Sequence, residues 1–183
     1  LKEYNKALKY YRDALIIEKR DGTKKGVGRL YSNIGSVYQK QNKPKLAIDY
    51  FQQSSKIYNK IGYKKGEALS ISNYNLMKLE LLKDNNPLEL KLILKEFQRA
   101  YNVFNELGDI EGKASSGYKI SNVYRRLGNV LMAEKFANES IILSKKIGFT
   151  ESIKNAAKAL VEIAVLKNDY RSAYHMQTLF FKM

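Results

Sequence analysis

Residues 30–62 have the sequence LYSNIGSVYQKQNKPKLAIDYFQQSSKIYNKIG, and this stretch decides the fold. Apolar residues recur every three or four positions on both sides of a short polar turn, which predicts two amphipathic helices. Pro44 suits the first turn of the second helix, where its missing N–H has no intrahelical acceptor to lose. Gly62 suits the left-handed conformation that often ends a helix. The stretch is therefore expected to form a helical hairpin.

The hairpin recurs along the chain. Ala7 and Ala47 lie 40 residues apart, as do Ala133 and Ala173, and the 86 residues between the two pairs allow two repeats plus six residues. A second series agrees, because IYNKIGYKKGEA (57–68) is matched by VFNELGDIEGKA (103–114) and LSKKIGFTESIK (143–154). Two independent series predict a repeat protein.

We expect a single array over residues 1–183, and no strand pattern occurs in it, so the predicted fold class is all-α. Leu1 lies within a helical pattern, which indicates a fragment of a longer protein whose targeting signals are not visible. The parts of the array are the second helix of a truncated repeat (1–24), a repeat at 25–64, a repeat at 65–110 with an insertion near 83–89, a repeat at 111–150 and a last repeat at 151–183.

The composition fits a folded, soluble protein, with 44% hydrophobic and 28% charged residues. No apolar run is long enough to cross a membrane. The formal net charge of +15 favours anionic partners such as nucleic acid, acidic peptides or lipid head groups. Against this, lysines lie on every predicted helix, as on an ordinary solvated surface. The absence of Cys excludes disulfides and thiolate metal sites, and it leaves both the cytoplasm and the periplasm open.

Catalytic chemistry finds no support in the sequence. His175 is the only histidine, so neither a histidine-based metal site nor a Ser/His/Asp arrangement can be built from it. The glycine-rich segment 22–28 lacks both the preceding strand and the Gly-Lys-Ser/Thr ending of a phosphate-binding loop. We predict no enzymatic activity, catalytic residue, metal or cofactor in this segment, and a catalytic output domain elsewhere in a longer protein stays open.

The hairpin resembles the tetratricopeptide repeat (TPR), whose first helix carries a large residue, Leu-Gly and Tyr, and whose second carries Ala, an aromatic and Ala. The resemblance implies a right-handed superhelix of antiparallel helix hairpins, an alpha-alpha superhelix or TPR solenoid. Small residues then stand where the helices of a hairpin cross, and large ones fill the space toward the neighbouring hairpin. The predicted packing residues are Tyr31, Ile34, Gly35, Tyr38, Ala47, Phe51, Ser54, Ser121, Tyr124, Ala133 and Ala173.

The family's first helices line a concave face that binds a peptide or helix. This implies candidate groove residues, whose amides and basic groups suit a peptide backbone and an acidic side chain or carboxylate. The alternative is that they are ordinary solvated side chains. They are Arg29, Ser32, Asn33, Ser36, Gln39, Ser72, Asn73, Leu76, Tyr118, Asn122, Arg125, Lys158 and Glu162.

The 40-residue repeat is similar to arrays in bacterial signalling proteins such as sensor kinases and helix-turn-helix regulators. It implies a scaffold that binds protein or peptide partners. The alternative is a basic helical-repeat surface for nucleic acid or another polyanion. Nucleic acid is the less favoured partner, because Tyr31, Tyr38, Tyr74 and Tyr124 fall on packing positions rather than on a stacking surface. The apolar end, with Leu179, Phe180, Phe181 and Met183, is expected to pack against a further helix or a second chain.

Overall fold

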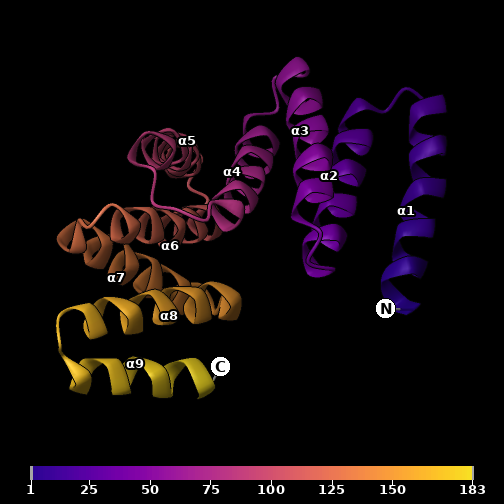
Figure 1. Ribbon diagram of the computed structural model, residues 1–183. Coiled ribbons are helices and arrows are strands. Elements are labelled where there is room, and N and C mark those ends of the chain that lie inside the picture. The colour runs from indigo at the N-terminus through magenta and orange to yellow at the C-terminus, as the bar shows by residue number, and fades with distance from the viewer. Residues whose placement is uncertain (1, 183) are drawn as a thin grey trace. The chain divides into compact units, whose positions relative to one another are not determined.

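The computed structural model describes residues 2–182, with side chains from 3 to 181, and this range folds into nine α-helices without a strand (Figure 1). The predicted all-α class is confirmed. Met183 lies outside the described residues. The helices are α1 (Lys2–Arg20), α2 (Lys24–Lys40), α3 (Pro44–Lys60), α4 (Lys64–Leu81), α5 (Pro87–Glu106), α6 (Ile110–Arg126), α7 (Val130–Ile147), α8 (Thr150–Leu166) and α9 (Tyr170–Lys182).

Local signals explain where the helices begin and end. Gly62 has a φ of +67°, and the four glycines at the ends of other helices also have positive φ, a conformation that costs glycine little. Pro44 and Pro87 each open a helix. The side chain of Asp109 caps α6 by accepting a hydrogen bond from the Gly112 N–H at 3.0 Å.

The helices form two compact units, residues 1–83 with α1–α4 and residues 84–183 with α5–α9, which we call unit 1 and unit 2. The boundary between Lys83 and Asp84 falls in the segment between α4 and α5, where the sequence predicts an insertion.

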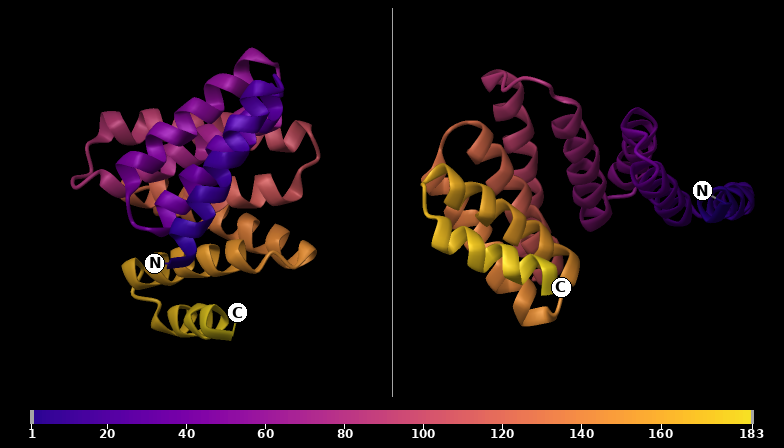
Figure 2. Two further views of the ribbon diagram at one scale, coloured as in Figure 1. Left: turned by 90° about the vertical axis from the view of Figure 1, so that its right-hand side faces the viewer. Right: turned by 60° about the horizontal axis from the view of Figure 1, so that its bottom comes forward.

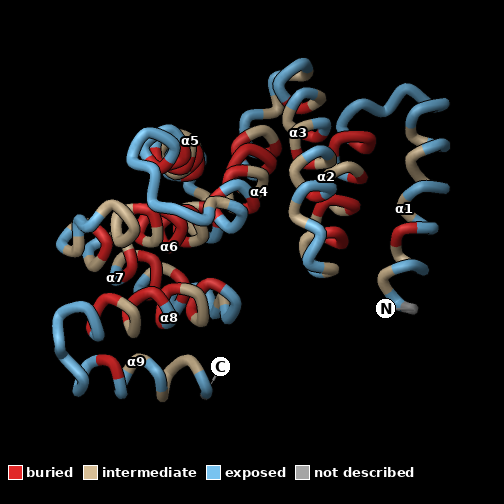
Figure 3. Tube along the Cα trace, viewed as in Figure 1, coloured by how far each residue is buried: buried red, intermediate tan, exposed pale blue. Residues whose placement is uncertain are grey.

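In unit 1 each helix packs against the next, and α2 also contacts α4 (Figures 1 and 2). The core lies between the helices, as the red segments of Figure 3 show, and Ile34 and Phe51 are fully buried in it. A Cβ added at Gly35 would lie 2.8 Å from the ring of Phe51. The glycine therefore lets α2 pack directly on an aromatic ring of α3.

In unit 2 each helix likewise packs against the next, α6 also contacts α8, and α8 and α9 remain side by side in both views of Figure 2. The Ser121 hydroxyl on α6 donates to the Ala133 carbonyl oxygen on α7 at 2.7 Å. Since Ser121 is equivalent to Gly35, a small residue allows close approach in both hairpins. The core cluster includes Ala137, Ile153 and Ile163.

The hairpins α2–α3 and α6–α7 contain equivalent contacts, 86 residues apart. The rings of Tyr38 and Tyr50 stack at 5.4 Å between centroids, and those of Tyr124 and Phe136 stack at 5.8 Å. Equivalent rings thus fill the same space in both hairpins.

Buried serines repeat in the same way. The Ser54 hydroxyl donates to the Gly28 carbonyl oxygen at 2.8 Å, and the Ser140 hydroxyl donates to that of Ala114 at 2.7 Å. Each bond joins the second helix of a hairpin to the first, and it satisfies a hydroxyl that would otherwise be costly to bury.

Candidate partner-binding surface

The first helices of the hairpins carry the candidate groove residues. On α2, Arg29 is exposed, and its Nη2 lies 3.8 Å from Oε1 of Glu18 on α1. Asn33 and Gln39 are half-buried. Ser36 donates a hydrogen bond to the carbonyl oxygen of Ser32 at 3.1 Å, within the helix. This part of α2 therefore presents a polar surface with one positive side chain.

The neighbouring helix α4 contributes fewer residues than expected. Asn73 and Leu76 are half-buried, whereas Ser72 is only 1% exposed. Buried positions cover more than one side of α4, including Ile71, Ser72 and Asn75, which explains why a polar residue there is not at the surface. The expectation that Ser72 offers surface to a partner is wrong.

In unit 2 the candidate residues of α6 and α8 meet. Nη2 of Arg125 on α6 lies 2.9 Å from Oε2 of Glu162 on α8, and both side chains are about one-third exposed, at 27% and 36%. The sequence placed both residues on the groove but did not predict that they pair. The charge of Arg125 is thus matched within the protein.

The surroundings of this ion pair are polar. Nε of Arg125 is buried and has no hydrogen-bond partner among the described residues. Asn122 is half-buried one turn earlier on α6, and Lys158 is exposed one turn before Glu162 on α8. An incoming carboxylate would compete with Glu162 for the guanidinium, and the Asn122 amide and the Lys158 ammonium each lie one turn away along their own helices.

Tyr118 was also expected on this surface, and the structure corrects that expectation. Its side chain is 9% exposed and belongs to the core cluster that includes Ala156 and Leu160 of α8. Because the neighbouring residues of α8 are small, the Tyr118 ring packs against that helix and is not accessible to a partner. Lys119 follows it on α6 and is 3% exposed, and burial lowers its pKa to about 8.

The predicted packing residues lie inside the hairpins, and two are only half-buried. Tyr31 stacks obliquely with Tyr50, and Tyr124 packs against the cluster of unit 2. The buried ones are Ile34, Gly35, Tyr38, Ala47, Phe51, Ser54, Ser121, Ala133 and Ala173.

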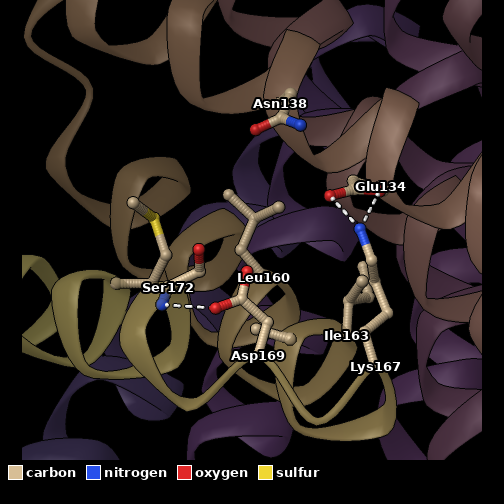
Figure 4. Close-up of a pocket in the computed structure, with 9 residues that line it drawn as sticks. Glu134, Asn138, Leu160, Ile163, Lys167, Asp169 and Ser172 are labelled. Carbon is tan, nitrogen blue, oxygen red and sulfur yellow. Dashed lines mark hydrogen bonds and ion pairs between the residues drawn. The ribbon is translucent and has the colours of Figure 1, made fainter.

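A cavity of about 140 Å³ lies where α7, α8 and the start of α9 meet (Figure 4). Both carboxylate oxygens of Glu134 accept from Nζ of Lys167 at 3.0 Å. Asp169 accepts from the backbone N–H of Ser172 at 3.0 Å, and hydrogen bonds from Ser172 hold the pKa of this carboxyl below its ordinary value. Glu134 and Lys167 are therefore engaged with each other, and Asp169 is engaged with Ser172.

A wider, open pocket of about 500 Å³ lies beside α5 and α6 and includes Tyr124 and Lys91. At its edge, Nε of Arg126 donates to Oδ1 of Asn85 at 2.8 Å, and Nη2 donates to the Asp84 carbonyl oxygen at 2.7 Å. Arg126 thus holds the segment before α5 against the end of α6.

Charge is unevenly divided between the units. Residues 1–83 contain 18 Lys and Arg against 7 Asp and Glu, a net charge of +11, whereas residues 84–183 contain 15 against 11, a net charge of +4. The occurrence of lysines on every predicted helix suggests an even spread of charge, and the division into units shows that the spread is uneven. The signal was the repeated pair Lys24–Lys25 and Lys64–Lys65, 40 residues apart.

The described residues contain no helix long and apolar enough to cross a membrane. Nor do they bring three or more His, Cys, Asp or Glu side chains together in a way that could hold a metal ion.

Comparison with known proteins matches the first part of the chain to a repeat family. Residues 1–60 match the family model of the tetratricopeptide repeat. Repeats of this family are generally protein-binding scaffolds and typically non-catalytic. No curated protein matches the chain.

Solved structures with low sequence identity share the fold. BtubC (BKLC) from P. vanneervenii has 15% identity and a TM-score of 0.72, over 95% of this chain and 70% of that one. A Rap protein complexed with competence and sporulation factor has 15% identity and a TM-score of 0.80, over 99% and 49%. A Signal Transduction ATPase with Numerous Domains from Pyrococcus horikoshii has a tetratricopeptide repeat sensor. It has 21% identity and a TM-score of 0.73, over 98% of this chain and 27% of that one. The chain thus has a TPR-like helical-repeat fold and spans about half of the Rap chain.

Proposed function

We propose that the chain is a scaffold for a protein or peptide partner and forms the sensory or interaction segment of a bacterial signalling protein. Two of the structural relatives support the signalling role, namely the Rap protein in complex with a factor and the ATPase with a repeat sensor. In this proposal the partner binds in unit 2 on the first helices α6 and α8, with its acidic group between them.

The observation that carries the proposal is the ion pair between Arg125 and Glu162. It joins two successive first helices while leaving both side chains partly accessible, at 27% and 36%. A ligand carboxylate can replace Glu162 in this pair, since Arg binds either carboxylate in the same planar geometry. Asn122 and Lys158 add an amide and a positive charge nearby.

The test uses the whole chain and a library of short synthetic peptides with free C-terminal carboxylates. The strongest binder is labelled, and its dissociation constant is measured by fluorescence anisotropy. Arg125→Ala should weaken binding about tenfold or more, because it removes a charge-assisted hydrogen bond. Glu162→Gln should strengthen binding, because it removes the internal competitor of the ligand carboxylate.

Lys135→Ala is the matched control, because Lys135 is exposed on α7, the second helix of the same hairpin. Its affinity should equal that of the parent protein. If Arg125→Ala and Glu162→Gln both bind the peptide as tightly as the parent, the partner does not use this surface and the proposal fails.

A further inference from the structure

We propose that one end of unit 1 is a second interaction surface, which binds an acidic segment of a partner protein. This surface, the basic end, consists of the last turns of α1 and α3 and the first turns of α2 and α4, which lie together because successive helices are antiparallel (Figure 1, top right). Its basic side chains are Lys19, Arg20, Lys24, Lys25, Lys60, Lys64 and Lys65; its acidic ones are Glu18, Asp21 and Glu67.

The two turns at this end have the same backbone geometry. In the first, the Lys24 N–H donates to the Gly22 carbonyl oxygen at 2.9 Å, and in the second the Lys64 N–H donates to that of Gly62 at 3.0 Å. Nζ of Lys25 lies 4.4 Å from the centre of the Tyr63 ring, so a lysine of one turn contacts the next turn. The two lysine pairs therefore form one continuous surface.

The fold does not require lysine at these positions. The first turn of a helix favours acidic residues, because the backbone N–H groups give it a partial positive charge. The equivalent turns of unit 2 follow this rule, with Glu111 and Glu151 where Lys25 and Lys65 stand. Lysine pairs in two helix starts thus oppose stability, which is expected of a surface that serves binding.

The chemistry of the basic end favours a protein segment over nucleic acid. Arg20 lies 3.1 Å from Asp21 and Arg29 lies 3.8 Å from Glu18, and these carboxylates offset part of the charge of the two arginines. The ring of Tyr63 lies 4.4 Å from Nζ of Lys25 and 5.2 Å from the Tyr58 ring in a T-shaped arrangement, so part of its surface is already covered within the protein.

Apolar side chains lie beside the lysines. Ile16 and Ile17, in the last part of α1, are 69% and 50% exposed. A polynucleotide backbone would gain little from them, whereas an acidic peptide with apolar residues would bury them.

The size of the surface also fits a peptide. Three steps between packed helices, each of about 8–10 Å, span at most about 30 Å. An extended segment of about nine residues covers that length. A peptide that alternates Glu and Leu supplies both kinds of contact.

The test uses the whole chain and a labelled nine-residue peptide of alternating Glu and Leu, with binding followed by fluorescence anisotropy. The variant with Lys24→Glu and Lys64→Glu should bind the peptide about tenfold or more weakly, because both side chains are exposed at the basic end. The matched control changes Lys43 and Lys45 to Glu, at the start of α3 and the opposite end of unit 1, for the same change in net charge. It should bind within about twofold of the parent, because α2, at about 1.5 Å per residue, is longer than the screening length.

Parallel titrations use single-stranded DNA, duplex DNA and vesicles that contain phosphatidylserine. Equal losses in the basic-end variant and the control would show attraction to overall charge and overturn the proposal. DNA or vesicles binding more tightly than the peptide, with loss in the basic-end variant alone, would overturn the assignment to a protein segment. Arg125→Ala should leave this binding unchanged, which separates the basic end from the surface between α6 and α8.

Discussion

The Tyr38 hydroxyl on α2 accepts a hydrogen bond from Nη2 of Arg12 on α1 at 2.9 Å, and an equivalent bond occurs 86 residues later. There the Tyr124 hydroxyl on α6 accepts from Nε2 of Gln98 on α5 at 3.1 Å. In both places a side chain on the second helix of one repeat donates a hydrogen bond to the tyrosine at the same position of the next repeat. The donor is charged in unit 1 and neutral in unit 2, so the strengths of a charged and a neutral hydrogen bond can be compared within one protein.

This pair predicts a measurable coupling between α1 and α2. Arg12→Ala and Tyr38→Phe should each lower the free energy of unfolding, and a double-mutant cycle should give a coupling of about 1.5–3 kcal/mol, as for a hydrogen bond from a charged group. The cycle for Gln98→Ala and Tyr124→Phe should give about 0.5–1.5 kcal/mol. Urea unfolding followed by circular dichroism measures both, and an equal coupling in the two cycles would contradict the expectation.

Close packing of α2 on α3 predicts that Gly35→Ala destabilises the protein. In an exposed helix this change would be stabilising by about 1 kcal/mol, because alanine is the better helix former. Here the new Cβ would lie 2.8 Å from the ring of Phe51, and overpacking of this kind costs about 1–3 kcal/mol. A lower melting temperature is therefore expected.

Ala47→Leu should also lower the melting temperature, because Ala47 is fully buried and overpacking costs about 1–3 kcal/mol. The exposed Lys56 on α3 provides the control, since Lys56→Ala should leave the melting temperature nearly unchanged. An unaltered melting temperature in both buried variants would show that the hairpin tolerates larger side chains at its crossing.

Lys119 predicts a dependence of stability on pH. Its pKa is lowered by burial to about 8 from an ordinary value of 10.5, so the unfolded chain binds more protons than the folded protein between these pH values. The free energy of unfolding should therefore rise as the pH increases from about 8 to 10.5, by roughly 3 kcal/mol from this group. Below pH 8 its contribution is constant.

Other lysines and tyrosines titrate in the same range, so the measurement compares the parent protein with Lys119→Met. The difference between their unfolding free energies isolates Lys119. The free energy of unfolding of Lys119→Met should exceed that of the parent protein most at pH 7, and this difference should shrink toward pH 10.5. A difference that does not change with pH would refute the expectation.

The lysines at the basic end predict a gain in stability when they are replaced. Lys24→Glu and Lys64→Glu place acidic groups in the first turns of α2 and α4, and each should raise the free energy of unfolding by about 0.3–1 kcal/mol. The gain should shrink in high salt, because salt screens the interaction. Lys56→Glu, which lies outside the first turn of α3 and nearer its C-terminal end, should bring no comparable gain. Thermal melts at two salt concentrations provide the comparison.

Much of the fold could be predicted from local sequence. Helix ends follow from residues with strong local preferences, such as Gly62 and Pro44, and the hairpins follow from apolar periodicity combined with a repeat. These signals act within a few residues of where they stand, so a single sequence displays them.

The candidate surface was harder to predict, because it depends on distances between helices. Arg125 and Glu162 are 37 positions apart, and only the packing of α6 against α8 shows that they pair. Ser72 and Tyr118 have the polarity of surface residues but lie where helices pack closely. A pattern along one helix gives the direction of a side chain, but it does not give the extent of the neighbouring helix.

The serine bonds from Ser54 to Gly28 and from Ser140 to Ala114 have a consequence for how such arrays lengthen. Each bond joins the two helices of one hairpin, so both of its partners lie within that hairpin. A copied hairpin would bring this bond with it, while the contact of Ser54 Oγ with Ser70 Oγ on α4, at 2.9 Å, would also depend on the next hairpin. An array can therefore lengthen by duplication of a hairpin without losing this hydrogen bond. Differences between the copies can then accumulate on the outward-facing side chains.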